Sequence, residues 1–190
     1  MRDDRKPAGA DVTHNKSGQT GRLIACVFAA LFFFAATARA GEDARVGDPA
    51  LFSFSAGAFD INDNDGAGML SFQYVSERRW IWHFRPTLGS FATFDGGLYA
   101  YAGLSLDLYF GKNFVVTPSF APGLYMRNGG KDLGSPIEFR SSIRAAWRFA
   151  DKSRLGIDLN HLSNAGIDDT NPGANQLLVF FAIPFSRDGK

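Results

Sequence analysis

The chain lacks several features that define common protein classes. It has one cysteine, Cys26, so an intrachain disulfide is excluded. Its formal charge is +1, which gives no reason to propose binding to nucleic acid. Beyond residue 40, no apolar run approaches the roughly 20 residues of a membrane-spanning helix. What the chain does have is 19 Phe and 21 Gly in 190 residues, a length that suggests one domain with an unusual composition for a soluble protein.

An apolar segment near the N-terminus indicates export. Residues 23–38 read LIACVFAALFFFAATA, follow Arg22, and lead into the small-x-small pattern Ala38-Arg39-Ala40. This pattern predicts a signal peptide over residues 1–40, cut after Ala40, and a mature domain over residues 41–190. A membrane anchor is the alternative, but about 16 apolar residues are short for one. The polar stretch before Arg22 is long for the first part of a signal peptide. We therefore expect the true translation start to lie after residue 1.

The rest of the chain alternates apolar and polar residues with a period of two, which indicates β-strands because side chains two apart share a face. Polar, Gly-containing turns separate the runs, as in antiparallel hairpins. Eight runs can be counted: Leu51–Phe59, Met69–Val75, Trp80–Phe94, Leu98–Phe110, Phe114–Arg127, Ile137–Phe149, Arg154–Ser163 and Asn175–Phe185.

Such strands suit either a soluble barrel of the lipocalin type, with the apolar face inside, or a membrane barrel. Three features favour the membrane: the runs are long enough for a tilted crossing, their number is even, and aromatic residues mark their ends. We therefore predict an all-β fold, an eight-stranded antiparallel up-and-down transmembrane β-barrel in the bacterial outer membrane. The aromatic residues expected at the interfaces are Trp80, Trp82, Phe94, Tyr109, Phe110, Phe114, Trp147, Phe149 and Phe185.

An eight-stranded barrel is filled by side chains and has no open pore. The polar face should therefore point inward and form an internal ion-pair network, and His83 shares that parity. Pro118 and Pro122 weaken one strand, which we expect to carry a bulge. The charged residues expected inside are Glu138, Arg140, Arg144, Arg148, Asp107 and Asp158.

One run carries polar residues on its apolar face. His161 and Ser163 continue the parity of Leu155, Ile157 and Leu159, so in a membrane barrel they face lipid. A serine hydroxyl becomes a nucleophile when a base takes its proton, and His161 and Ser163 are about 7 Å apart at Cα. With periplasmic termini, the pair lies at the outer end of its strand, where it would meet lipopolysaccharide. His-x-Ser alone is a weak signal.

The segment His161-Leu162-Ser163-Asn164-Ala165-Gly166, followed by Asn171-Pro172-Gly173, resembles the signature of the lipid A 3-O-deacylases (the PagL or acyloxyacyl hydrolase family). The resemblance extends over most of residues 50–185. It implies an outer-membrane serine esterase that hydrolyses the 3-position acyl ester of lipid A, with no cofactor and no metal. By this resemblance Ser163 is the nucleophile, His161 the general base, and Asn164 and the backbone near Gly166 the oxyanion donors.

The chain departs from the family at one position. Asn175 stands where the family has a glutamate that orients the imidazole. Its carbonyl oxygen can hold the histidine tautomer, but it cannot stabilise an imidazolium by charge, and Asp168 or Asp169 is a possible substitute. The alternative function is therefore a non-catalytic outer-membrane barrel with a structural or lipid-binding role. Acyl-chain preference stays open, as does the oligomeric state, for which a homodimer is one option.

Overall fold

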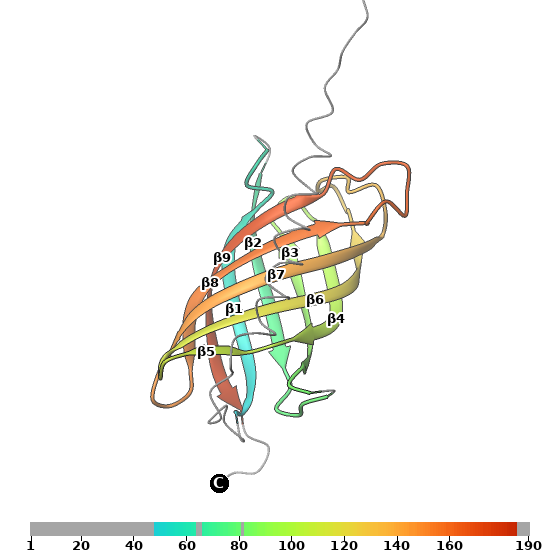
Figure 1. Ribbon diagram of the computed structural model, residues 1–190. Helices are drawn as coiled ribbons and strands as arrows, with labels where there is room; N and C mark the ends of the chain where they lie inside the picture. Colours follow the sequence, from blue (N-terminus) through green and yellow to red (C-terminus); the bar gives the residue numbers. More distant parts are fainter. Residues whose placement is uncertain (1–47, 64–65, 81, 186–190) are drawn as a thin grey trace, which may run out of the picture. The chain divides into compact units, whose positions relative to one another are not determined.

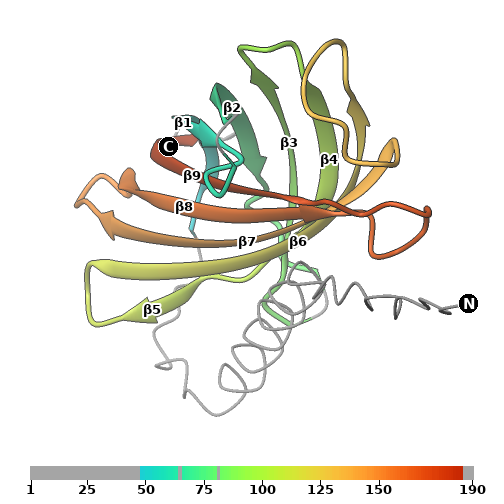
Figure 2. The same cartoon turned by 90° about the horizontal axis from the view of Figure 1, so that it is seen from above.

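The computed structural model describes residues 48–63, 66–80 and 82–185, and these form a closed barrel of tilted antiparallel strands (Figure 1). The predicted signal peptide, with Cys26, lies outside the described residues. Figure 2, seen from above, shows the strands arranged around a common interior. The strands are β1 (Ala50–Phe59), β2 (Ala67–Val75), β3 (Arg85–Thr93), β4 (Leu98–Ser105), β5 (Leu108–Phe110), β6 (Phe114–Met126), β7 (Ile137–Arg148), β8 (Arg154–Ser163) and β9 (Ala174–Phe185).

Each strand pairs with its neighbours in sequence, and two further pairings close the ring. β1 pairs with β9, and β4 pairs with β6. β5 pairs with β6 in the same register as β4, so β4 and β5 are two parts of one barrel strand. The predicted eight-stranded antiparallel barrel is confirmed, with its fourth strand split.

The split has a physical cause in the neighbouring strand. Pro118 has no N–H and so cannot donate to the ladder, although its carbonyl oxygen accepts from the Leu106 nitrogen at 3.0 Å. Beside this gap, Asp107 turns its carboxylate to Arg85 at 2.8 Å and to Arg154 at 2.9 Å. The expected bulge is wrong, because the register between β6 and β7 is constant along their whole pairing.

The interior of the barrel holds two buried carboxylates, each shared by two guanidinium groups. Asp158 accepts from Arg140 at 3.0 Å and from Arg144 at 2.7 Å, and Asp107 accepts from Arg85 and Arg154. The predicted ion-pair network is therefore confirmed for these groups, and Arg148 joins it through Asp48.

Glu138 is the exception inside the barrel. Its side chain is fully buried, yet among the described residues neither carboxylate oxygen has a hydrogen-bond partner. The prediction that it belongs to the ion-pair network is wrong, because Asp158 takes the two nearest arginines of β7.

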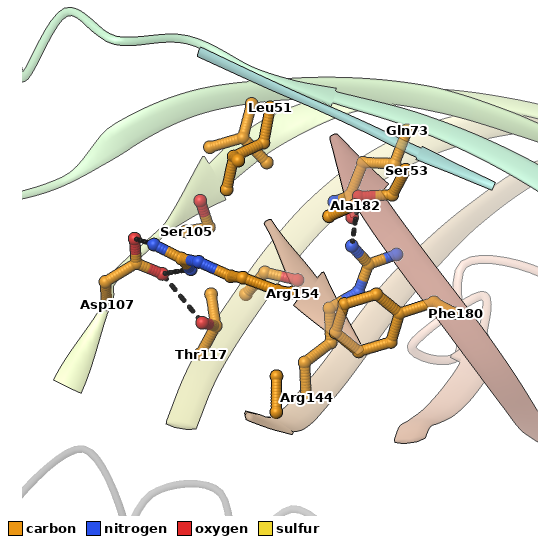
Figure 3. A pocket seen from close by; sticks show the side chains of 13 residues that line it. Leu51, Ser53, Gln73, Ser105, Asp107, Thr117, Arg144, Arg154, Phe180 and Ala182 are labelled. Carbon is orange, nitrogen blue, oxygen red and sulfur yellow. Dashed lines mark hydrogen bonds and ion pairs between the residues drawn. The ribbon is translucent and has the colours of Figure 1, made fainter. Parts of the chain in front are cut away.

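A cavity of about 20 Å³ lies within this polar interior (Figure 3). Figure 3 shows Arg154 and Thr117 meeting at Asp107, and Arg144 reaching Ser53 beside the ring of Phe180. The volume of this cavity is sufficient for about one water molecule, as expected for an eight-stranded barrel whose interior is filled by side chains.

The outward-facing residues of the strands are mostly apolar, as expected for a face in lipid. Eight of the nine aromatic residues predicted at the membrane interfaces are exposed on the barrel. Tyr109 is half-buried, and its hydroxyl lies 3.1 Å from Arg154 of the interior network. The exposed members of the predicted set are Trp80, Trp82, Phe94, Phe110, Phe114, Trp147, Phe149 and Phe185.

His83 does not lie in the barrel. β3 begins at Arg85, and Trp82 and His83 occupy a turn in which Trp82 has a φ of 62°. His83 is exposed, so the prediction that it packs inside is wrong. The alternation that suggested a longer strand ends at this turn, where the Trp80 nitrogen donates to the Phe84 oxygen at 2.7 Å.

The two ends of the barrel differ. One, which we call the terminal end, carries the first and last described residues and the turns at residues 76–84, 111–113 and 149–153. The other, the loop end, carries residues 60–66, 94–97, 127–136 and 164–173. In the part of the chain that the structure describes, no helix is long and apolar enough to span a membrane.

Candidate active site on the outer face of the barrel

β8 presents His161 and Ser163 outward at the loop end. The alternate residues Asp158, Asn160 and Leu162 are buried inside, while Leu155, Ile157 and Leu159 are exposed outside. His161 and Ser163 continue the exposed row and are half-buried. The polar pair therefore lies on the apolar outer face, as its parity predicts, and away from the interior cavity.

Asn175 lies directly across from His161 on β9, where the two residues are register partners. The His161 Nδ1 atom is 2.8 Å from the Asn175 Oδ1 atom. Because an amide oxygen only accepts, Nδ1 donates in this contact, which leaves Nε2 as the ring atom that can accept a proton. The amide thus fixes the tautomer that a general base needs.

The imidazole ring leans toward the loop end. A Cβ placed on Gly173 would lie 3.3 Å from the His161 Cε1 atom and 3.7 Å from Nε2. Gly173 directly precedes Ala174, the register partner of Leu162, so it lies beside the end of β8 that carries Ser163. The tip of the ring therefore occupies the space beside Ser163 that a side chain at position 173 would restrict.

Asn164 organises the loop that follows Ser163. Its Nδ2 donates to the Thr170 oxygen at 2.7 Å and to the Leu133 oxygen at 3.3 Å, and its Oδ1 accepts from the Gly166 nitrogen at 2.9 Å. The side chain is fully buried. In this structure the Asn164 Nδ2 atom and the Gly166 backbone nitrogen, the two predicted oxyanion residues, therefore already donate to acceptors in the loops.

Asn171 is a residue whose part in the site the sequence alone does not indicate. Its Oδ1 accepts from the Asn164 backbone nitrogen at 3.1 Å, which turns its own amide nitrogen away from that contact. The side chain is exposed, and within residues 48–63, 66–80 and 82–185 this nitrogen has no acceptor. An amide donor beside Asn164, the residue after Ser163, is thus left available.

The two loop aspartates do not replace the family's acid. Asp168 and Asp169 are exposed, and the His161 ring makes its hydrogen bond with Asn175. No group of three or more His, Cys, Asp or Glu side chains within metal-binding reach occurs among the described residues.

Ser141 is a second feature that the sequence does not single out. It is the register partner of His161 on β7, on the side opposite Asn175, and it shares the outward face. The row Ser141, His161 and Asn175, with Ser163 beside it, forms what we call the outer polar patch. The remaining outward serine of the described strands, Ser90, lies away from it on β3.

The fold and this patch define a bacterial outer-membrane β-barrel with a histidine and a serine on its lipid-facing surface. A family profile described as "Lipid A 3-O-deacylase (PagL)" matches residues 66–184, well over half of the chain. The chain belongs to the PagL lipid A 3-O-deacylase family, which confirms the resemblance seen in the sequence.

A curated relative, lipid A deacylase PagL of Pseudomonas aeruginosa, is 36% identical over 58 residues. That segment covers 30% of this chain and about a third (34%) of the relative's own length.

Two solved structures share the fold. The crystal structure of the outer membrane enzyme PagL has a TM-score of 0.57 at 20% identity, covering 71% of this chain and 99% of that one. The crystal structure of Neisserial surface protein A has a TM-score of 0.52 at 11% identity, covering 73% and 98%. At these identities the likeness concerns the barrel alone.

Proposed function

We propose that the protein is a serine esterase that hydrolyses the acyl ester at the 3-position of lipid A. The observation that carries the proposal is the 2.8 Å contact between His161 Nδ1 and Asn175 Oδ1 on the outer face, beside Ser163. An uncharged amide that orients an imidazole next to a hydroxyl has no evident use in lipid other than chemistry. Membership of the lipid A deacylase family supports the same conclusion.

The reaction follows from the arrangement of these three side chains. The Nε2 atom of His161 takes the Ser163 hydroxyl proton while the Ser163 oxygen bonds to the ester carbonyl carbon. Collapse of the tetrahedral intermediate breaks the bond to the sugar oxygen, which receives the proton from His161. A water molecule, deprotonated by His161, then cleaves the acyl-serine ester, releasing the fatty acid and restoring the Ser163 hydroxyl.

The tetrahedral intermediate carries a negative oxygen that needs hydrogen-bond donors. Asn164 and Gly166 stay our candidates, because their loop begins at the residue after Ser163. Before either residue can donate to the oxyanion, its present hydrogen bond in the loop must break. Asn171 adds an amide nitrogen that is already available, and Asn164 orients it through the 3.1 Å bond to Oδ1.

The orientation of the barrel supports a substrate in the outer leaflet. Outer-membrane barrels have short periplasmic turns and longer extracellular loops. Residues 127–136 and 164–173 are long connections at the loop end, whereas β5 and β6 are joined at the terminal end by residues 111–113. With the loop end outside, the outer polar patch lies in the leaflet that holds lipopolysaccharide.

Asn175 also supports a second candidate, a barrel of the same fold without catalysis. The amide holds the neutral tautomer but contributes no charge when the imidazolium forms. In a serine protease, the equivalent change from aspartate to asparagine lowers kcat by about ten-thousand-fold. Here the amide oxygen accepts from Nδ1, so the tautomer is correct and we expect a smaller loss.

The test is mass spectrometry of lipid A after incubation with the refolded barrel in detergent, compared with Ser163→Ala. Loss of one 3-linked acyl chain with the wild type alone is the expected result. Heat-dependent migration on a gel shows that both proteins are folded. Unchanged lipid A with folded wild-type protein would favour the non-catalytic barrel.

A further inference from the structure

A sheltered ion pair joins two loops that lie on opposite sides of the barrel mouth. The Lys131 Nζ atom, in the loop between β6 and β7, contacts the carboxylate of Asp60, in the loop between β1 and β2. In the strand order of the barrel, two strands separate these loops in either direction, β9 and β8 on one side and β3 and β4 on the other. The pair therefore crosses the mouth at the loop end.

The segment that carries Lys131 is fixed from inside the barrel. The buried Tyr125 hydroxyl donates to the Lys131 backbone oxygen at 3.0 Å, and Leu133 packs fully buried among the apolar residues of the interior. The Lys131 side chain is 24% exposed and that of Asp60 7%, and Asp63 lies 3.5 Å from the Lys131 Nζ atom. A pair this sheltered is screened less by salt than an exposed pair, so its loss should cost more.

The Asp60 end of the ion pair leads to Asn175. The backbone nitrogen of the next residue, Ile61, donates to the Asn175 backbone oxygen at 3.0 Å. This bond continues the ladder between β1 and β9 just past their last register pair. Asn175 is thus held along both edges of its strand, by Ile61 on one side and by its register partner His161 on the other. The residue that orients the imidazole therefore depends on the position of the loop that carries Asp60.

The Lys131 end of the ion pair leads to Asn164. The Leu133 backbone oxygen accepts from the Asn164 Nδ2 atom at 3.3 Å, and this atom also donates to the Thr170 oxygen at 2.7 Å. The two loops touch through their backbones, since a Cβ placed on Gly134 would lie 2.2 Å from the Thr170 oxygen. The loop that carries Lys131 therefore supports the loop that follows Ser163.

We propose that the Lys131–Asp60 pair is a clamp that positions the active site, holding Asn175 through one loop and Asn164 through the other. The inference rests on the proposed esterase function and adds two positioning residues to it. Both residues lie in the mouth of the barrel, away from the outer face that meets the substrate. Loss of the clamp should therefore displace the orienting and oxyanion groups and lower kcat, while KM changes little.

Initial rates of lipid A deacylation in detergent, measured over a range of lipid A concentrations, separate kcat from KM. Lys131→Met and Asp60→Asn should each lower kcat by about tenfold, because small displacements of catalytic groups are costly, and leave KM within about twofold. Asp60 has a φ of 56°, which asparagine tolerates, so Asp60→Asn keeps the backbone. The double variant should be no slower than either single variant, because both remove the same interaction.

Two further variants distinguish positioning by this pair from a general effect on the loop. Lys131→Arg keeps the positive charge and should restore most of kcat. Arg127→Met is the matched control, because it removes the exposed ion pair that the same loop makes with Asp132 at 2.9 Å. An exposed pair contributes little, so this variant should deacylate lipid A at the wild-type rate.

Hydrogen exchange measured by mass spectrometry separates this inference from the proposed function, because it needs no turnover. In folded Lys131→Met, the peptides that contain Ile61 and residues 164–166 should exchange about tenfold faster than in the wild type, with the β7 peptides unchanged. That result supports the clamp even if the wild type leaves lipid A intact, which would overturn the proposed function alone. Unchanged exchange at either segment, or an unchanged kcat where the wild type is active, overturns the clamp.

Discussion

The barrel has two polar regions that differ in how they treat charge. Inside, Asp107 and Asp158 each bind two arginines, so buried charge is neutralised by close ion pairs. Outside, the outer polar patch contains hydroxyl, amide and imidazole groups with one hydrogen bond among them at 2.8 Å, and it contains no carboxylate. The difference suggests that the interior serves stability and the patch, left under-satisfied, serves chemistry. Changes in one region should therefore leave the property of the other intact.

The largest expected effect is on activity. Ser163→Ala removes the nucleophile and should lower the rate of lipid A deacylation by at least about ten-thousand-fold. The unfolding free energy should change by less than about 0.5 kcal/mol, because the half-buried hydroxyl has no hydrogen-bond partner to lose among the residues that the structure describes. Rates from lipid A mass spectrometry and urea unfolding in detergent check both parts. A large stability loss would break the separation of the two regions.

The second change tests the interior. Asp158→Ala leaves Arg140 and Arg144 buried without their shared carboxylate, which should destabilise the barrel by about 3–5 kcal/mol. The protein that remains folded should keep its deacylation rate, since Asp158 faces away from His161. The same unfolding assay measures this loss. A folded variant with abolished activity would show that the interior network holds the site in place.

The third change adds charge to the patch. Asn175→Glu should raise kcat about 10–100-fold, because a carboxylate stabilises the imidazolium by roughly 1–3 kcal/mol more than an amide. Asn175→Gln is the matched control, with the same length and no charge, and should bring no gain. If Glu and Gln behave alike, the site works without an acid.

The fourth change fills the space beside the imidazole. Gly173 has a φ of 65°, and an added Cβ would press on the His161 ring and on the Leu162 oxygen at 3.0 Å. Gly173→Ala should lower kcat by about tenfold through displacement of the ring. Gly111→Ala is the control for backbone strain, because its φ is 66° and its Cβ would meet nothing within 4 Å. Equal rates for the two variants would remove the steric role of Gly173.

The smallest effect belongs to a charge outside both regions. Asp151, in the turn between β7 and β8, accepts from the Ser153 hydroxyl at 2.6 Å and from its backbone nitrogen at 3.0 Å, and these bonds lower the pKa of Asp151. A lowered carboxyl pKa stabilises the fold above the unfolded-state pKa, and this is lost as pH falls through the folded pKa. Asp151→Asn should therefore differ slightly in melting temperature from wild type at neutral pH, and the difference should vanish in acid. A difference in melting temperature between Asp151→Asn and the wild type that persists in acid would show that the substitution changes packing in the turn and not the charge at Asp151.

Much of the fold was predictable because the alternation is strict where one face meets lipid. In β8 the parity of Leu155, Ile157 and Leu159 is enough to predict that His161 and Ser163 lie on the outer face. The pattern failed where the backbone leaves the strand. Nothing in the alternation around Leu106 reveals that Pro118 stands opposite and opens a gap, or that His83 belongs to a turn.

The site was predictable only along one strand. His161 and Ser163 are neighbours in sequence, and Asn175 could be aligned with a family position. Ser141 and Asn171 join them through register and loop hydrogen bonds, which the sequence does not encode as a spacing. For Glu138, the parity correctly predicts that the side chain points inward. It does not predict that the carboxylate lacks a hydrogen-bond partner among the described residues.

The central claim is that His161 activates Ser163 on the outer surface, and covalent labelling tests it most directly. The folded barrel in detergent would be incubated with a fluorophosphonate probe, digested and analysed by mass spectrometry. The account predicts one adduct, on Ser163, that is absent in Ser163→Ala and strongly reduced in His161→Ala. No adduct on folded wild-type protein, or an adduct on Ser141, would contradict it.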